Sequence, residues 1–169
     1  SRLDNVTADR FKLTDVPSSV ELSASNLRAA RLNADGTVIE GLEAPEVSLK
    51  DTPAETEIYS DTLRVAKIDA GSAVLGSLNI AGVRLTIREG RVEGRSNDID
   101  AGSVALAKTS SLPSGGNLQD VKIAKPVFVL EPSGRYRASA DMSLGGGVIG
   151  SVPLGAANAQ VVVNNDGAE

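Results

Sequence analysis

The sequence of 169 residues contains no cysteine, no histidine and no tryptophan, and only two phenylalanines and two tyrosines. Without cysteine and histidine the chain can form no disulfide, no thiolate or imidazole site for zinc, and no triad with a histidine base. The Ser-x-x-Lys pair and the Gly-x-Ser-x-Gly motif of other serine nucleophiles are also missing from the sequence. We therefore predict that the chain is not an enzyme and holds no metal ion or other cofactor.

The charge balance and the scarcity of rings argue against nucleic acid as a partner. The formal net charge is −5, so no bulk attraction to phosphate is expected. Four aromatic rings spread along the chain are too few for a base-stacking platform.

No stretch of the sequence approaches the ~18 consecutive apolar residues that a membrane helix needs, and no secretory signal heads the chain. The sequence starts at Ser1 without a methionine. We interpret it as a segment of a longer protein, and any membrane anchor is then expected outside this segment.

The dominant pattern is the alternation of apolar and polar residues, which is typical of strands with unlike faces. Residues 20–25, 83–88 and 136–144 alternate in this way, whereas residues 127–130 are apolar on both faces. Residues 61–70 fit a short helix or a strand, and we favour the strand because Leu63 and Val65 continue the alternation. Signals for helices are otherwise scarce.

Turn residues separate the alternating stretches where hairpins need them. Asp35-Gly36, Glu89-Gly90 and Pro132-Ser133-Gly134 are each followed by another alternating stretch. The sequence therefore predicts an all-β protein, with a long, twisted antiparallel sheet and little or no helix. We expect a single domain over residues 1–169, with a long loop at about residues 109–117.

Four arginines lie within twelve residues, at positions 84, 88, 91 and 95, and Glu89 and Glu93 lie among them. One interpretation is a solvated strand face on which Arg–Glu pairs add small cross-strand energies. The other is a rim that binds phosphate head groups, since the arginine fork suits phosphate. The candidates for such a rim are Arg84, Arg88 and Arg91.

The chain offers aliphatic side chains in place of a local motif. They are either the core of a sandwich or solenoid, or the wall of an open groove that is covered by acyl chains. The sequence alone does not separate these two interpretations. Our candidates for a groove wall are Leu63, Val65, Leu78, Ile80, Val83, Leu85, Ile87, Val127 and Val129.

Residues 63–94 read LRVAKIDAGSAVLGSLNIAGVRLTIREGRVEG, and residues 27–38 repeat this sequence pattern more weakly. The pattern resembles that of the AsmA-like, repeating β-groove proteins of Gram-negative envelopes, most closely the YdbH-type branch. The stretch Ile80–Val92 carries the closest match, an apolar strand followed by Gly90 and a second strand. The texture, rich in serine, alanine and glycine, resembles the family over most of the chain.

The resemblance implies a periplasmic segment of a bridge-like protein, anchored in the inner membrane outside this segment. Such a protein carries phospholipid toward the outer membrane along a hydrophobic β-groove, and the resemblance implies other envelope proteins as partners. Two alternatives stay open: a structural or adhesive β-solenoid or sandwich with no ligand, and a β-sheet scaffold that binds a partner strand at its edge.

Overall fold

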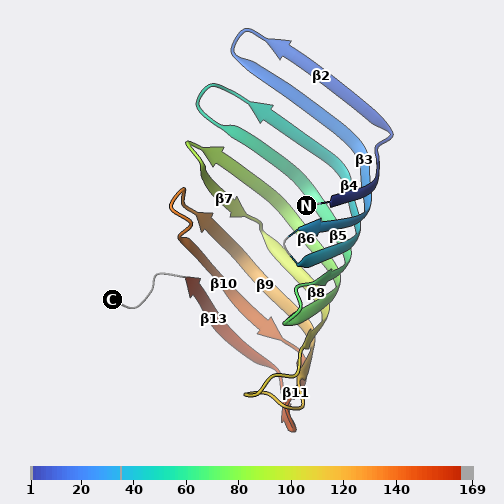
Figure 1. Cartoon of the computed structure of the whole chain (residues 1–169), viewed down its shortest axis with the longest axis vertical. Coiled ribbons are helices and arrows are strands. Elements are labelled where there is room, and N and C mark those ends of the chain that lie inside the picture. The colour runs from blue at the N-terminus through green and yellow to red at the C-terminus, as the bar shows by residue number, and fades with distance from the viewer. Residues whose placement is uncertain (1, 35, 165–169) are drawn as a thin grey trace.

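A computed structural model describes residues 2–34 and 36–164, which form thirteen strands in one antiparallel sheet (Figure 1). These residues contain no helix, so the prediction of an all-β chain is confirmed. The strands are β1 Arg2–Thr7, β2 Arg10–Val16, β3 Ser19–Ala34, β4 Thr37–Asp51, β5 Thr56–Asp69, β6 Ala73–Arg88, β7 Arg91–Arg95, β8 Asp98–Leu106, β9 Gly116–Leu130, β10 Tyr136–Leu144, β11 Gly146–Ile149, β12 Val152–Leu154 and β13 Ala157–Asn164.

The chain meanders, so that each long strand pairs with its neighbour in the sequence. β1 and β2 lie end to end along β3, and β7 and β8 lie end to end between β6 and β9. β10 and β11 follow β9 in the same manner, and β13 pairs with β10. Among the described residues, the path through the sheet ends at β1 and β2 on one side and at β13 on the other.

The turns agree with the turn chemistry of the sequence. Glu89 and Gly90 join β6 to β7 with φ values of 50° and 78°, as a type I′ turn requires. Residues 132–134 lie within the turn that joins β9 to β10, whereas Asp35 lies outside the described residues. Residues 61–69 belong to β5, as predicted, and residue 70 follows that strand. The long loop covers residues 107–115, so it ends earlier than expected because Gly116 and Asn117 already pair in β9.

Every long strand is bent along a first line that crosses the sheet. In β5 and β6, Ser60 pairs with Val83 and Thr62 pairs with Ala81, while the residues between them have no partner in the ladder. Backbone hydrogen bonds continue across the bend, for example from the Asn97 amide to the Ala81 carbonyl at 2.8 Å. We call this the first bend line. From β3 to β10 it passes Asn26, Pro45, Asp61, Gly82, Asn97, Lys125 and Ala140.

A second bend line crosses the sheet nearer to the end of β3, where Ala34 pairs with Thr37 at the start of β4. On every other strand it carries a residue with positive φ: Asn5 at 51°, Gly41 at 63°, Ser77 at 56° and Asp120 at 51°. The strands between them, and the link from β10 to β11, contribute a small residue at the same level. These small residues are Ala30, Ala66, Gly102 and Gly145.

The two bend lines divide the sheet into three facets, which we name by their place. The mouth facet holds β2, β7 and the strand segments beside them, the middle facet lies between the bend lines, and the base facet holds β11. At each bend the set of inward-facing residues moves by one position. In β6 the inward residues are therefore Leu75, then Leu78 and Ile80, then Val83, Leu85 and Ile87.

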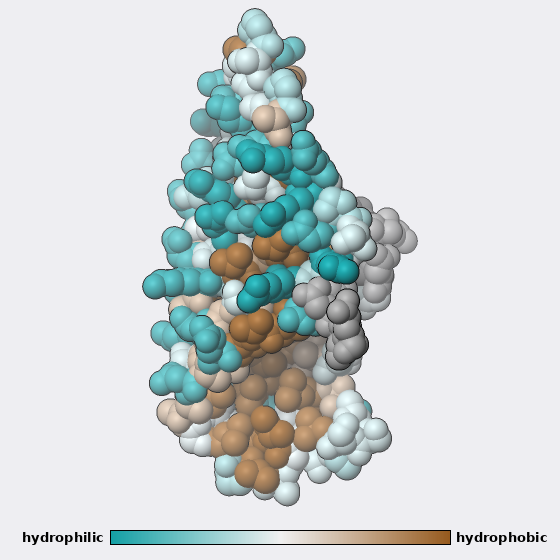
Figure 2. Space-filling model, turned by 90° about the vertical axis from the view of Figure 1, so that its left-hand side faces the viewer, coloured by the Kyte–Doolittle hydropathy of each residue, from teal (hydrophilic) through white to brown (hydrophobic). Residues whose placement is uncertain are grey.

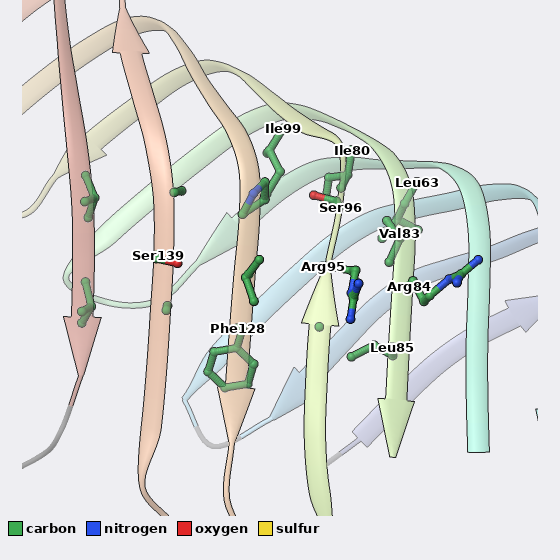
Figure 3. Close-up of a pocket in the computed structure, with 17 residues that line it drawn as sticks. Leu63, Ile80, Val83, Arg84, Leu85, Arg95, Ser96, Ile99, Phe128 and Ser139 are labelled. Carbon is green, nitrogen blue, oxygen red and sulfur yellow. The ribbon is translucent and has the colours of Figure 1, made fainter. Parts of the chain in front are cut away.

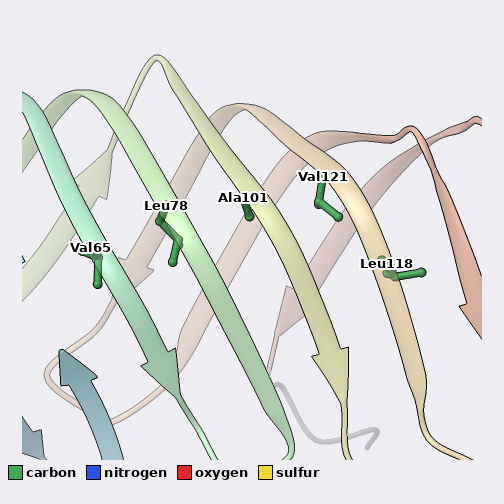
Figure 4. Close-up of a cluster of buried hydrophobic side chains, with 5 residues drawn as sticks. All are labelled: Val65, Leu78, Ala101, Leu118 and Val121. Atoms are coloured by element: carbon green, nitrogen blue, oxygen red, sulfur yellow. The ribbon is translucent and has the colours of Figure 1, made fainter. Parts of the chain in front are cut away.

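The core lies along the second bend line, where the middle and base facets pack together. Its buried side chains are Val65, Leu78, Ala101, Leu118 and Val121 (Figure 4). Ile149 and Leu154 of the β11–β12 hairpin pack against this cluster. A folded monomer of 17.3 kDa exposes about 7,800 Å², whereas this chain exposes 10793 Å². The sheet is thus a single curved layer, and no second sheet of described residues covers its inner face.

Gly41→Ala is expected to be more destabilising than the same change at a turn. A Cβ atom at Gly41 would lie 2.7 Å from the Ala66 Cβ, and φ at Gly41 is +63°. Gly71 also has a positive φ of +75°, but its surroundings are open. We expect Gly71→Ala to lower the free energy of unfolding by about 1–2 kcal/mol and Gly41→Ala by about 2–4 kcal/mol.

Urea unfolding followed by far-ultraviolet circular dichroism measures this difference. Equal losses for the two variants would show that the close approach at the second bend line is not a constraint on the sheet.

Candidate functional site

The candidate site is an apolar groove at the first bend line, between the mouth facet and the middle facet. It has a volume of about 380 Å³, within the range of about 300–1,000 Å³ that small-molecule sites occupy. Leu63, Ile80 and Ile99 line it from the middle facet, and Val83, Leu85 and Phe128 line it from the mouth facet (Figure 3). β5 to β9 thus contribute to one continuous apolar wall.

The groove is hollow because large and small residues alternate across the strands. One row of directly opposed residues runs from Leu85 through Gly94, Phe128 and Ala138 to Val163. Opposed residues in an antiparallel sheet share a face, so all of them point inward. Gly94 and Ala138 leave space between the larger side chains, and Phe128 is 38% exposed. Figure 2 shows the resulting apolar hollow between more polar margins.

Two serines lie where the groove meets the first bend line. The buried Ser60 hydroxyl donates a hydrogen bond to the Glu46 carbonyl oxygen at 2.8 Å. This bond satisfies a backbone carbonyl at the bend, where the pairing of β4 with β5 is interrupted. Ser96 lines the groove, and its buried Oγ has no hydrogen-bond partner among the described residues. Ser139 also lines the groove, which therefore has two hydroxyl groups in largely apolar surroundings.

Most of the predicted wall residues do face inward. Leu63, Ile80, Val83 and Leu85 line the groove. Val65 and Leu78 lie in the buried cluster at the second bend line. Ile87 is inward at the mouth of the facet, opposite Thr56 and Val92, and is 37% exposed.

Val129 differs from the expectation, and Val127 meets it only in part. They pair with Glu93 and Arg95, which places them on the outward face, although Val127 also borders the groove. Phe128 between them points inward and is not among the predicted wall residues. The available signal was Pro126, because a proline inside a strand marks a bulge or an irregular position.

The three rim candidates lie on the outward face of β6 and β7, and Arg84 also borders the groove. Their guanidinium groups pair with glutamates: Arg84 with Glu57 at 3.6 Å, Arg88 with Glu55 at 2.9 Å, and Arg91 with Glu131 at 3.6 Å. At least half of each arginine side chain is exposed, so these pairs contribute little to stability. This arrangement is that of a solvated strand face with balanced charge.

Tyr59 belongs to the same outward face. The Arg84 guanidinium carbon lies 5.5 Å from the centre of its ring. Its phenol donates a hydrogen bond to the Asp61 carboxylate, which stabilises the protonated phenol and raises the pKa of Tyr59. The polar interactions of this region thus lie behind the groove wall.

Within residues 2–34 and 36–164 there is no cluster of acidic side chains that could hold a metal ion, and no helix that could cross a membrane. Comparison with family models, curated proteins and solved structures yields no match for this chain. The geometry of the groove therefore carries the functional argument.

Ala138→Trp is expected to fill the groove, because Ala138 points inward between Phe128 and Val163. The matched control is Arg137→Trp, on the neighbouring residue of β10, which is exposed and faces outward. Binding of a neutral, fluorescent apolar probe should weaken roughly tenfold, or about 1.4 kcal/mol, in Ala138→Trp only. Equal probe affinities in the two variants would mean that the probe does not bind in the groove.

Proposed function

We propose that this chain carries the acyl chains of phospholipids along its apolar inner face, as a segment of a periplasmic, bridge-like envelope protein. The observation that carries the proposal is the open groove at the first bend line. Its wall is mostly aliphatic, and no second layer of described residues covers it. An inner face of this kind needs another apolar material to remove it from water.

Acyl chains supply such a material without specific polar contacts. Burial of each CH₂ group contributes roughly 0.8 kcal/mol, so about ten buried methylenes contribute roughly 8 kcal/mol. Smooth aliphatic side chains such as Leu63, Ile80 and Leu85 do not hold an acyl chain at one fixed position along the groove. Movement of the lipid along the groove is then passive, while its head group stays in water at the open side of the groove.

The resemblance to AsmA-like proteins supports the location and the cargo that we propose. In that setting the phospholipid moves between the inner and the outer membrane, and the anchor in the inner membrane lies outside this segment. Other envelope proteins are the proposed partners at its ends.

The alternatives differ in what covers the inner face. A β-sandwich needs two packed sheets, whereas the described residues form a single sheet. A structural trough without ligand leaves the groove empty, and a scaffold that binds a partner strand uses the edges of the sheet instead. Lipid bound to the purified chain distinguishes the proposal from both.

Leu85→Glu and Thr86→Glu form a matched pair for this test. Leu85 faces the groove, and Thr86 is its neighbour on the outward face opposite Glu57 and Glu93. Organic extraction of the purified chain followed by mass spectrometry measures the bound phospholipid. We expect Leu85→Glu to retain at least tenfold less phospholipid than Thr86→Glu, because an unpaired carboxylate costs about 2 kcal/mol or more to desolvate.

Circular dichroism shows whether both variants keep the sheet. A natural chain that emerges free of lipid, or folded variants that retain equal amounts, would contradict the proposal. A variant Leu85→Met keeps the wall apolar and should retain phospholipid like the natural chain.

A further inference from the structure

The groove contains one buried hydroxyl group that no described residue satisfies. Ser96 follows β7 at the first bend line and lines the groove together with Ile80, Val83 and Ile99 (Figure 3). Among residues 2–34 and 36–164, its Oγ is the only buried side-chain oxygen or nitrogen without a hydrogen-bond partner. A hydroxyl that has left water without gaining such a partner destabilises the protein, so its presence calls for an explanation.

The bend at Ser96 is held by backbone hydrogen bonds and does not need the hydroxyl. The Ser96 amide donates a hydrogen bond to the Pro126 carbonyl oxygen at 3.2 Å. Ser60 is the contrasting case beside the same bend line, because its hydroxyl donates to the Glu46 carbonyl oxygen at 2.8 Å. The Ser60 hydroxyl thus supports the sheet, whereas the Ser96 hydroxyl is left for a ligand.

We infer that Ser96 donates a hydrogen bond to an ester carbonyl of the phospholipid in the groove and makes the groove selective for ester-linked lipids. This inference rests on the proposed function and assigns a residue to the contact with the polar end of the acyl chain. An ester carbonyl accepts hydrogen bonds, and a serine hydroxyl donates one. The carbonyl is also joined directly to the acyl chain, so it enters an apolar groove together with that chain.

The Ser96 side chain reaches such a ligand by rotation about one bond. The residue as a whole is half-buried and lines the groove, although its Oγ is shielded. The Cα–Cβ bond has three staggered positions, and a change between them moves Oγ relative to the groove surface without movement of the backbone. Ile80, Val83 and Ile99 offer no competing side-chain acceptor, so the ligand supplies it.

The same contact gives the lipid a preferred position on a wall that is otherwise uniform. When the carbonyl lies at Ser96, the first methylenes lie against aliphatic side chains on either side of the first bend line, such as Ile80 and Val83. One hydrogen bond contributes little beside the burial of a whole acyl chain. The lipid therefore pauses at Ser96 and remains free to move along the groove.

Two phospholipids that differ only in their linkages test the inference. Dioctanoyl phosphatidylcholine has ester carbonyls, and its dioctyl ether analogue has the same head group and chain length without them. Each lipid, kept below its micelle-forming concentration, displaces a fluorescent apolar probe from the groove, which gives its dissociation constant. We expect the preference for the ester over the ether to be about fivefold lower in Ser96→Ala than in the natural chain. Comparing this ratio between two proteins cancels the unequal hydrophobicity of the lipids.

Ser139→Ala is the matched control, because it removes the other serine hydroxyl that lines the groove, on β10, and should keep the preference. Urea unfolding without lipid should give Ser96→Ala a midpoint equal to or above that of the natural chain, since the change removes an unsatisfied hydroxyl. Equal preferences in the natural chain and Ser96→Ala, loss of the preference in Ser139→Ala, or a lower midpoint for Ser96→Ala overturns the inference. Binding of both lipids without discrimination leaves the proposed function standing, whereas binding of neither contradicts the proposed function as well.

Discussion

The curved shape of the sheet depends on a constraint on the backbone. A hydrogen-bonded sheet can bend sharply only where neighbouring strands depart from extended geometry together. Adjacent strands share their ladder, so a bend in one strand must continue in the next. The chain satisfies this requirement with two aligned rows of bulges, left-handed residues and small side chains. Asn97 and Lys125 keep backbone hydrogen bonds across the first row, which makes it a bend in the sheet and not an interruption.

The two bend lines have different roles because their inner surfaces are filled differently. At the second line, Val65, Leu78 and Val121 pack with residues of the base facet and form the core. At the first line, Gly94 and Ala138 leave the space between larger neighbours open. Stability and the candidate function are thus separated along each strand by only a few residues.

The sequence permits a good prediction of the strands and the hairpins, but not of the bends. Alternation and turn residues identify β6, β7 and β10, because each local segment has a period of two. At Gly82 the alternation of inward and outward residues shifts by one position, so that Ile80 and Val83 lie on one face. The local sequence pattern does not reveal this shift. In β9 the same effect reverses the expected orientation of Val127 and Phe128. Ser77, Asp120 and Lys125 take positive φ without being glycine, so their conformation follows from neighbouring strands and not from their own preference.

The scarcity of aromatic residues is part of the same physical solution. Large rings on an inward face would meet across a bend and fill it, as core side chains do at close packing. Small and aliphatic residues instead let the first bend line stay open, at the cost of apolar surface that remains in contact with water. In the function that we propose, an acyl chain covers the inner face of the curved single sheet as the second sheet does in a sandwich.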